Sequence, residues 1–367
     1  MTHRERHNNI MSFKPVDRIP LVEWPIRGAT MKAWTAQGYP EGTDPGAYFS
    51  WDPYCHGVPV NMFMRPMFEH KIIEINGEYK IWQDELGAVR KDFVTTANEG
   101  FVTRSWLSFP VSDKKSFEEM QKRYNPADPG RMPADFENVS DNLKNTKVNT
   151  HLAIPFLFWT VRDWVGFENL CIMFYDNPGL VKEMFAFVTD FCIETLKGKI
   201  DRLSVDTVEL KEDMAYKHAP MISPAMFREF MYPHYERLVS FLKSNGVKFV
   251  MVDCDGFPGG LIPEWIDAGV DSMSPVEIAA ENDLDMIQRE YPRFGLYGGV
   301  DKRELAKDRR AVYEEVEKIP RRIERGGYIP HVDHAIPHDV PLANYIYYRE
   351  LLASIASGGT LGEFKNI

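Results

Sequence analysis

The stretch Phe249-Val250-Met251-Val252-Asp253-Cys254-Asp255-Gly256 changes abruptly from four apolar residues to two carboxylates that flank a thiol. An apolar run of this length predicts a short strand that is buried on both faces. A buried strand that ends in polar side chains and a glycine loop is typical of α/β enzymes whose site lies at the carboxyl end of a sheet. An ordinary Asp-Gly turn explains the stretch equally well. The choice between a functional site and a structural turn therefore depends on the rest of the chain.

Strands and helices alternate regularly after residue 150. The segment 21–24 predicts a first strand, and Ser223-Pro224 is a typical helix start that leads to a helix end at Asn245-Gly246. This alternation predicts a parallel sheet, and the number of units favours a closed (β/α)8 TIM barrel over an open sheet. The later predicted strands span 152–158, 205–210, 249–252, 272–276, 294–297 and 328–332.

An antiparallel insert is predicted near the N-terminus. Alternating runs at 68–75 and 78–82 are joined by Asn76-Gly77, a pair that favours a hairpin turn, and a third strand follows at 88–95. We therefore expect one barrel domain over 1–367, with a small inserted β region at about 55–110.

Composition narrows the class of protein. Net charge is −11 and no run rich in Lys or Arg occurs, which argues against a nucleic-acid partner. No apolar run reaches membrane-spanning length, and the first ten residues are too polar for a secretory signal. The four cysteines form no C-x-x-C pair, which suits the reducing cytoplasm. The expectation is a cytoplasmic enzyme that does not bind membranes.

Ionisable side chains follow the ends of five successive predicted strands. In a barrel these ends meet on one face, so residues far apart in sequence would surround one cavity. Strand ends also supply helix caps, and any single acidic residue could be structural. The five groups are Glu209 to Asp213, Asp253 to Asp255, Glu277, Asp301 to Arg303, and His331 to His334.

Asp253 and Asp255 project from the same side of their strand, because side chains two residues apart share a face. With His334 they would provide two carboxylates and an imidazole, a set that suits zinc, manganese or iron. Cys254 points the other way if the strand stays regular. His331 is a second histidine close enough in sequence to serve the same site.

A purely structural role for the two carboxylates is the alternative. Asp255 would then serve the Asp-Gly turn, and Asp253 would pair with Lys302 or Arg303.

Substrate-binding residues are expected on the opposite wall. Arg27 follows the first predicted strand and could hold a carboxylate, as could Arg162. Trp159 lies three residues before that second arginine, and Trp24 and Trp51 would suit an aromatic pocket.

Several segments together resemble the uroporphyrinogen decarboxylase superfamily, and the resemblance spans nearly the whole chain. It implies a (β/α)8 barrel and an enzyme that is either a porphyrinogen decarboxylase or a methyltransferase of corrinoid-dependent methyl transfer. The segments are 212–216 with 222–227, 252–256, 298–301 and 328–334.

The decarboxylase branch clamps its substrate with an Arg-Gln-Ala-Gly-Arg loop. Residues 25–30 of this chain keep only one arginine, Arg27. A substrate with four acetate side chains needs several cations, so the departure argues against that reaction.

The methyltransferase branch usually holds zinc on a His-x-Cys pair and a distant Cys. Aligned on Gly256, Asp253 and Asp255 stand in place of that pair, and His334 falls near the distant Cys. The loss of thiolates argues against a thiol acceptor and suits an O- or N-methyl donor, such as an aryl methyl ether. Its leaving oxygen would need a proton or a metal.

The resemblance therefore implies transfer of a methyl group from a small methoxylated or methylated substrate to a corrinoid carried by a separate protein, as in O-demethylation. The chain has no Asp-x-His-x-x-Gly segment for a corrinoid of its own. A metal-free decarboxylase and a non-catalytic cofactor-binding barrel are the alternatives, and a homodimer is compatible with the sequence.

The predicted catalytic residues are Asp253, Asp255, His334 and Asp213, of which the first three are also the predicted ligands of a zinc ion. The predicted substrate-binding residues are Trp24, Arg27, Trp159, Arg162, Glu209, Tyr216, Glu277 and His331.

Overall fold

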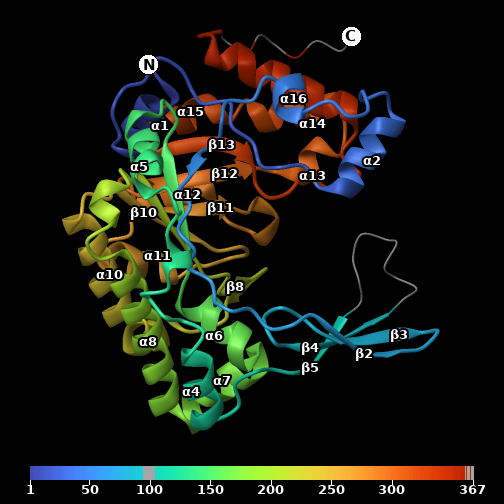
Figure 1. Cartoon of the computed structure of the whole chain (residues 1–367). Helices are drawn as coiled ribbons and strands as arrows, with labels where there is room; N and C mark the ends of the chain where they lie inside the picture. The colour runs from blue at the N-terminus through green and yellow to red at the C-terminus, as the bar shows by residue number, and fades with distance from the viewer. Residues whose placement is uncertain (94–103, 360, 362–363, 365–367) are drawn as a thin grey trace.

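A parallel sheet forms the centre of the molecule (Figure 1). The computed structural model describes residues 1–93, 104–359, 361 and 364. Within them the sheet has seven strands in the order β1-β6-β7-β10-β11-β12-β13, and every neighbouring pair is parallel. The strands are β1 (His56–Gly57), β6 (Thr150–Pro155), β7 (Thr207–Lys211), β10 (Phe249–Asp253), β11 (Ser272–Val276), β12 (Gly295–Val300) and β13 (Tyr328–Val332).

The predicted parallel α/β architecture is confirmed, whereas a ring of eight strands is not. Residues 21–24 form no strand in the described structure. Pro20 and Pro25 flank the segment and have no N–H to donate to a ladder. Glu23 instead accepts a hydrogen bond from the backbone N–H of Val332 at 3.2 Å, so a side chain replaces a ladder bond at the edge of β13.

Helices connect the strands and surround the sheet (Figure 1). They are α1 (His3–Met11), α2 (Gly28–Ala36), α3 (Pro45–Tyr48), α4 (Lys114–Gln121), α5 (Phe136–Asn145), α6 (Leu157–Val165), α7 (Phe167–Asp176), α8 (Pro178–Leu196), α9 (Pro224–Phe230), α10 (Tyr232–Ser244), α11 (Leu261–Asp267), α12 (Leu284–Glu290), α13 (Lys302–Leu305), α14 (Arg309–Val316), α15 (Ile319–Glu324) and α16 (Leu342–Ala356). No helix among them combines the length and apolar composition needed to cross a bilayer.

Local sequence explains where several helices begin. Ser223 caps α9 by accepting a hydrogen bond from the N–H of Met226, and proline occupies the first helical position. The helix predicted to continue to residue 245 is divided at Met231 into α9 and α10. The strand predicted at 152–158 ends earlier, at Pro155, because α6 begins at Leu157.

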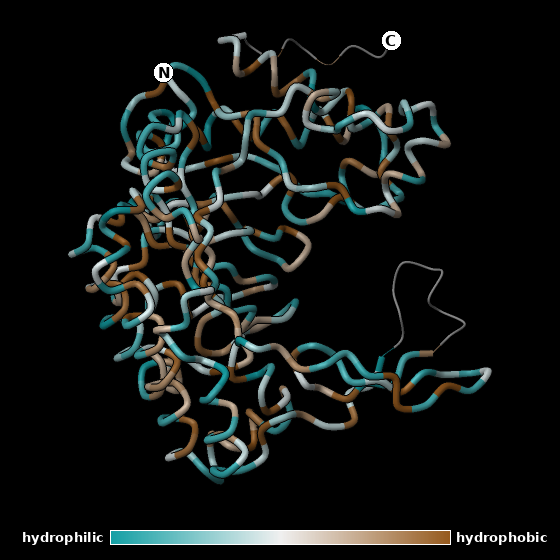
Figure 2. Tube along the Cα trace, in the orientation of Figure 1, coloured by the Kyte–Doolittle hydropathy of each residue, from teal (hydrophilic) through white to brown (hydrophobic). Residues whose placement is uncertain are grey.

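A second, antiparallel sheet projects from the body of the molecule (Figure 1). It consists of β2 (Lys71–Ile75), β3 (Tyr79–Gln83), β4 (Val89–Phe93) and β5 (Arg104–Ser108), in that order. The predicted hairpin joins β2 to β3, and residues 94–95 of the predicted third strand lie outside the described residues. Apolar residues lie along the projecting strands in Figure 2. A further two-stranded sheet pairs β8 (Ala215–Tyr216) with β9 (Ala219–Pro220).

The two faces of the parallel sheet bury different clusters. Cys254 is fully buried in the main core, in agreement with the prediction that it faces away from the two carboxylates. Strand alternation therefore places Asp253 on the same face as Met251, toward a smaller inner cluster. That cluster contains Ile10, Met11, Val22, Phe249, Met251, Tyr297 and Ile329.

Candidate active site

Three neighbouring strands bring four ionisable side chains together at one end of the inner face. Lys211 Nζ on β7 donates to Asp253 Oδ2 on β10 at 2.9 Å and lies 3.4 Å from Glu209 Oε2. The same Glu209 oxygen is 3.1 Å from His151 Nε2 on β6. The contacts form one continuous chain from His151 to Asp253.

The charges of these four side chains depend on one another. Burial raises the pKa of Asp253 to about 7, and the negative charge of Glu209 acts in the same direction. Burial also opposes ionisation of Glu209, but the hydrogen bond from His151 and the charge of Lys211 outweigh it and hold the Glu209 pKa below its usual value. Burial disfavours the Lys211 ammonium, yet the two carboxylates raise its pKa, so it stays charged.

A cavity of about 1010 Å³ opens above Glu209, Lys211 and Asp253. Trp24, Trp51 and Tyr54 contribute aromatic side chains to its lining. Among the described residues, the lining contains five carboxylates and one basic side chain, Lys211. The complete lining is Glu23, Trp24, Pro25, Ile26, Asp44, Pro45, Gly46, Ala47, Trp51, Asp52, Pro53, Tyr54, Cys55, Glu209, Lys211 and Asp253.

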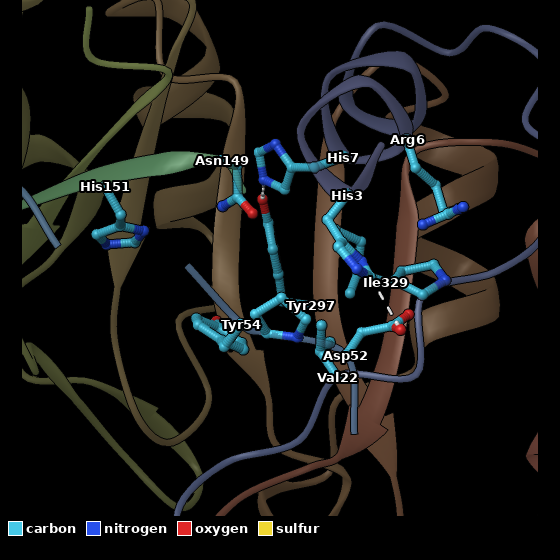
Figure 3. A pocket seen from close by; sticks show the side chains of 12 residues that line it. His3, Arg6, His7, Val22, Asp52, Tyr54, Asn149, His151, Tyr297 and Ile329 are labelled. Carbon is cyan, nitrogen blue, oxygen red and sulfur yellow. Dashed lines mark hydrogen bonds and ion pairs between the residues drawn. The ribbon is translucent and has the colours of Figure 1, made fainter. Parts of the chain in front are cut away.

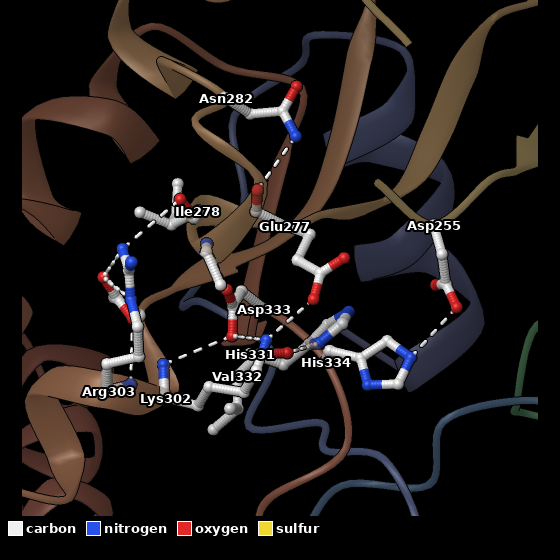
Figure 4. Close-up of polar contacts among 12 residues, drawn as sticks. Asp255, Glu277, Ile278, Asn282, Lys302, Arg303, His331, Val332, Asp333 and His334 are labelled. Atoms are coloured by element: carbon white, nitrogen blue, oxygen red, sulfur yellow. Dashed lines mark hydrogen bonds and ion pairs between the residues drawn. The ribbon is translucent and has the colours of Figure 1, made fainter. Parts of the chain in front are cut away.

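A second polar group is centred on Asp255, whose Oδ2 lies 3.1 Å from His334 Nε2 (Figure 4). The hydrogen bond to this carboxylate raises the pKa of His334. Asp213 Oδ1 accepts a hydrogen bond from the backbone N–H of Asp255 at 3.2 Å. Asp213 has a φ of +40°, which is unusual for a residue with a side chain and is typical of strained backbone at functional sites.

Glu277 lies beside this pair but is bound to other groups. Its Oε1 accepts a hydrogen bond from Lys302 Nζ at 2.9 Å, and its Oε2 accepts one from the N–H of Gly256 at 3.1 Å. Lys302 Nζ also donates to Asp333 Oδ1 at 3.2 Å (Figure 4). Glu277 therefore holds the glycine turn and the Lys302 ammonium in place next to Asp255.

Trp24 connects the cavity with the two histidines that follow β13. Its ring centroid lies 5.8 Å from that of His331, with 27° between the planes, and 5.6 Å from that of His334. His331 is fully buried, and burial lowers its pKa to about 4, so it is neutral. Its Nδ1 lies 2.8 Å from the carbonyl oxygen of Val332, which assigns the proton to Nδ1. Nε2 has no hydrogen-bond partner in the described structure.

The structure brings two of the three predicted metal ligands together, Asp255 and His334, but not Asp253. Among the described residues, no three His, Cys, Asp or Glu side chains form a group that could hold a metal ion. The carboxylate of Asp253 is bound to Lys211, not to Lys302 or Arg303, while Asp255 pairs with His334. This arrangement does not fit a three-ligand zinc site, and we derive no chemical step through a metal.

The remaining predicted residues lie apart from the cavity. Arg27 is exposed at the N-terminal end of α2. Arg162 donates to the carbonyl oxygen of Asp213 at 2.8 Å, and its guanidinium carbon lies 5.1 Å from the Trp159 ring centroid. Tyr216 is 52% exposed and lines a separate groove of about 450 Å³ together with Asp255 and Glu277.

Several side chains of the site were not predicted, among them His151, Lys211 and Tyr54. The sequence does contain an indication of Lys211. It is two residues after Glu209 on the same strand, so its side chain lies on the same face of the sheet. Nothing in the sequence near Tyr54 indicates a site, since it lies on an irregular segment before β1.

A small enclosed cavity of about 20 Å³ lies farther along the inner face (Figure 3). His151 and Tyr297 are among its lining residues, and His7 Nε2 lies 2.8 Å from the Tyr297 hydroxyl oxygen. Its volume suits about one water molecule and excludes an organic substrate.

Comparison with known proteins supports a family assignment. Residues 160–353, more than half of the chain, match the family model described as "Uroporphyrinogen decarboxylase (URO-D)". A curated uroporphyrinogen decarboxylase from Campylobacter concisus (strain 13826) is 26% identical over 205 residues, which cover 52% of this chain and 55% of that protein. The chain thus matches about half the length of this curated relative.

A solved structure described as a methyltransferase from Methanosarcina mazei has the same fold. It superposes with a TM-score of 0.59 over 96% of this chain and 99% of that chain, at 15% sequence identity. At this identity the similarity concerns the fold alone.

Proposed function

Because the chain belongs to the uroporphyrinogen decarboxylase family, we propose that it is the methyltransferase of a corrinoid-dependent demethylation system. It would move a methyl group from a small methoxylated or methylated donor to a corrinoid carried by a separate protein. The observation that carries the proposal is the cavity lining, in which, among the residues that the structure describes, five carboxylates accompany a single basic side chain, Lys211. A porphyrinogen with several carboxylates would be repelled there, since each needs a cation or hydrogen-bond donor.

The side chains have separate tasks in this proposal. The cavity over Asp253 and Lys211 binds the donor, and Trp24 connects this cavity with His334, whose ring lies in contact with the indole. The Asp255–His334 pair supplies a general acid, because the carboxylate favours the protonated imidazole. For an O-methyl donor the carbon–oxygen bond breaks and the departing oxygen takes this proton. A reduced corrinoid, when bound, supplies the nucleophile for the methyl carbon.

Decarboxylation is the second candidate, favoured by the family match and by the name of the curated relative. Lys211 would then hold the carboxylate of a small substrate. The limited basic lining restricts such a substrate to one or two carboxylates.

An anaerobic assay of purified protein with cob(I)alamin distinguishes these functions. Methoxylated and N-methylated donors should convert the cob(I)alamin spectrum to that of methylcobalamin. Asp255→Asn should lower kcat/KM by about 100-fold or more for a donor that needs a proton. Trp106→Leu, on the projecting sheet, is the matched control and should leave the rate unchanged, because Trp106 lies outside the cavity lining.

Two outcomes oppose the proposal. Substrate-dependent release of carbon dioxide with no change in the corrinoid spectrum would assign the decarboxylase role. If neither methyl transfer nor carbon dioxide release is detected, and the protein binds a corrinoid or its carrier protein tightly, a non-catalytic binding role would be assigned.

A further inference from the structure

We infer that the methyl donor is a cation, a small compound with a methylated ammonium group, and not a neutral or anionic methoxyarene. The inference rests on the proposed methyl transfer and specifies its substrate class. It is carried by the combination of aromatic walls and excess carboxylates around the same cavity.

The aromatic walls are held by their neighbours. Trp24 stacks on His331, and the Tyr54 ring meets the same imidazole edge-on, with centroids 6.1 Å apart and 72° between planes. Trp51 stacks on Phe49, with centroids 6.2 Å apart and 21° between planes. Aromatic rings fixed in this way require little ordering when a ligand binds. Tryptophan and tyrosine faces attract cations, and cages of such rings recognise quaternary ammonium groups.

The charge of the lining favours a cation as well. Arg18 donates to both carboxylate oxygens of Asp52, at 2.6 and 2.8 Å, and Arg349 lies 3.9 Å from Glu23. Among the described residues, these two arginines and Lys211 are the arginine and lysine side chains paired with any of the five carboxylates of the lining, and the imidazoles of His3 and His151 lie beside Asp52 and Glu209. At pH 8 the Glu23 and Asp253 carboxyls, each with a pKa of about 7, are largely ionised. The cavity then has a net negative charge, which attracts a cation and repels an anion.

A methylated ammonium donor also suits the chemistry available. The carbon–nitrogen bond breaks, its electron pair stays on nitrogen, and a neutral amine leaves. The methyl carbon forms its new bond with an electron pair from the acceptor, a reduced corrinoid, which is oxidised by two electrons. A quaternary nitrogen needs no proton on departure. The transfer therefore proceeds without His334, which is not part of the cavity lining.

Binding of two isosteric probes tests the charge directly. Choline and its carbon analogue 3,3-dimethylbutan-1-ol have nearly the same shape and differ in the positive charge. Calorimetric titration at pH 8, without any corrinoid, should give choline at least about ten-fold tighter binding than the alcohol, the ratio expected for a partly desolvated cation–aromatic contact. Equal or weaker binding of choline, or tighter binding of 4-methoxybenzoate, would overturn the inference.

Substitutions of single tryptophans test which aromatic rings contact the ammonium group. Trp24→Leu and Trp51→Leu should each weaken choline binding by about five-fold or more while changing the affinity for the alcohol much less. Trp106→Leu is the matched control and should change neither. The binding measurement needs no methyl transfer. A failure of the cationic-donor inference can therefore be told apart from a failure of the proposed methyltransferase function. Methyl transfer to cob(I)alamin from a neutral methoxyarene, with no preference for choline, would retain the proposed function and refute the cationic donor.

Discussion

His334 Nε2 lies 3.1 Å from Asp255 Oδ2, although the strands that precede these residues, β13 and β10, are separated by β11 and β12. Strands in a sheet are about 4.8 Å apart, so a flat sheet would keep side chains at these positions roughly 14 Å apart. The contact therefore requires the sheet to curl around its inner face. Residues 79 positions apart in the sequence become partners through this curvature.

Asp255→Asn should lower the pKa of His334 toward its ordinary value, because the hydrogen bond to the carboxylate is the main cause of the raised pKa. The pair stabilises the folded protein below pH 6.5, and this contribution is lost as the pH rises through the raised pKa. Since Asp255 is 42% exposed, the effect on the free energy of unfolding should be about 1 kcal/mol or less. An NMR titration of the imidazole checks the shift, and an unchanged His334 titration in the variant contradicts it.

Lys211→Met should destabilise the protein by about 1–3 kcal/mol at pH 8, because it leaves Glu209 and Asp253 facing each other without their shared cation. The pKa of Asp253 should rise further, since the Lys211 ammonium lowers it in the wild-type protein. Urea unfolding measures the first effect. Lys115→Met, at an exposed position of α4, should have almost no effect. Equal stability of the two variants would show that the Lys211 contacts are not formed.

The chain shows which features a sequence can reveal. The apolar run 249–252 predicted a buried strand, and the alternation of side chains correctly turned Cys254 into the core. Asn76-Gly77 marked a hairpin that is present between β2 and β3. These features depend on local periodicity and turn chemistry, which are written in neighbouring residues.

Of the contacts between distant residues, the proximity of Asp255 and His334 was predicted, and most others were not. The cation next to Asp253 is Lys211, from the adjacent strand, because the parallel register sets the two residues opposite each other. Residues 21–24 have an apolar pattern suited to a strand, yet flanking prolines and the Glu23 side chain take the place of ladder pairing. Register and edge bonding emerge only in the assembled sheet.

Glu212→Leu should destabilise the protein by about 3 kcal/mol, although the residue belongs to a segment that resembles the family. The buried Glu212 carboxylate accepts hydrogen bonds from the N–H groups of Phe158 and Trp159, at 2.7 and 3.2 Å, and from the Tyr235 hydroxyl at 2.7 Å. Leucine would leave all three donors without a partner. Glu212→Gln retains an acceptor and should cost less than half as much in a urea unfolding experiment. Equal losses for the two variants would refute a capping role at the start of α6.

Asp253→Asn should change how stability depends on pH. Burial raises the Asp253 pKa from its ordinary 3.8 to about 7, so the folded protein holds this proton more tightly than the unfolded chain. The contribution of Asp253 to the free energy of unfolding should therefore fall as the pH rises from about 4 to about 7. Asparagine does not titrate, so the variant should gain about 1–4 kcal/mol relative to the wild-type protein across this window.

Urea unfolding at pH 4.5, 6 and 8 measures this difference, with Asp201→Asn at an exposed position as the control. The lost contact with Lys211 lowers the stability of Asp253→Asn at pH 8, but Glu209, 3.4 Å away, still partners that ammonium. As the pH rises, the free energy of unfolding of Asp253→Asn should therefore still increase relative to that of the wild-type protein. The increase will be smaller than the Asp253 pKa alone implies. Stability curves of the variant and the wild-type protein that run parallel from pH 4.5 to 8 would show that Asp253 ionises normally. The proton held at the floor of the cavity would then be absent at neutral pH.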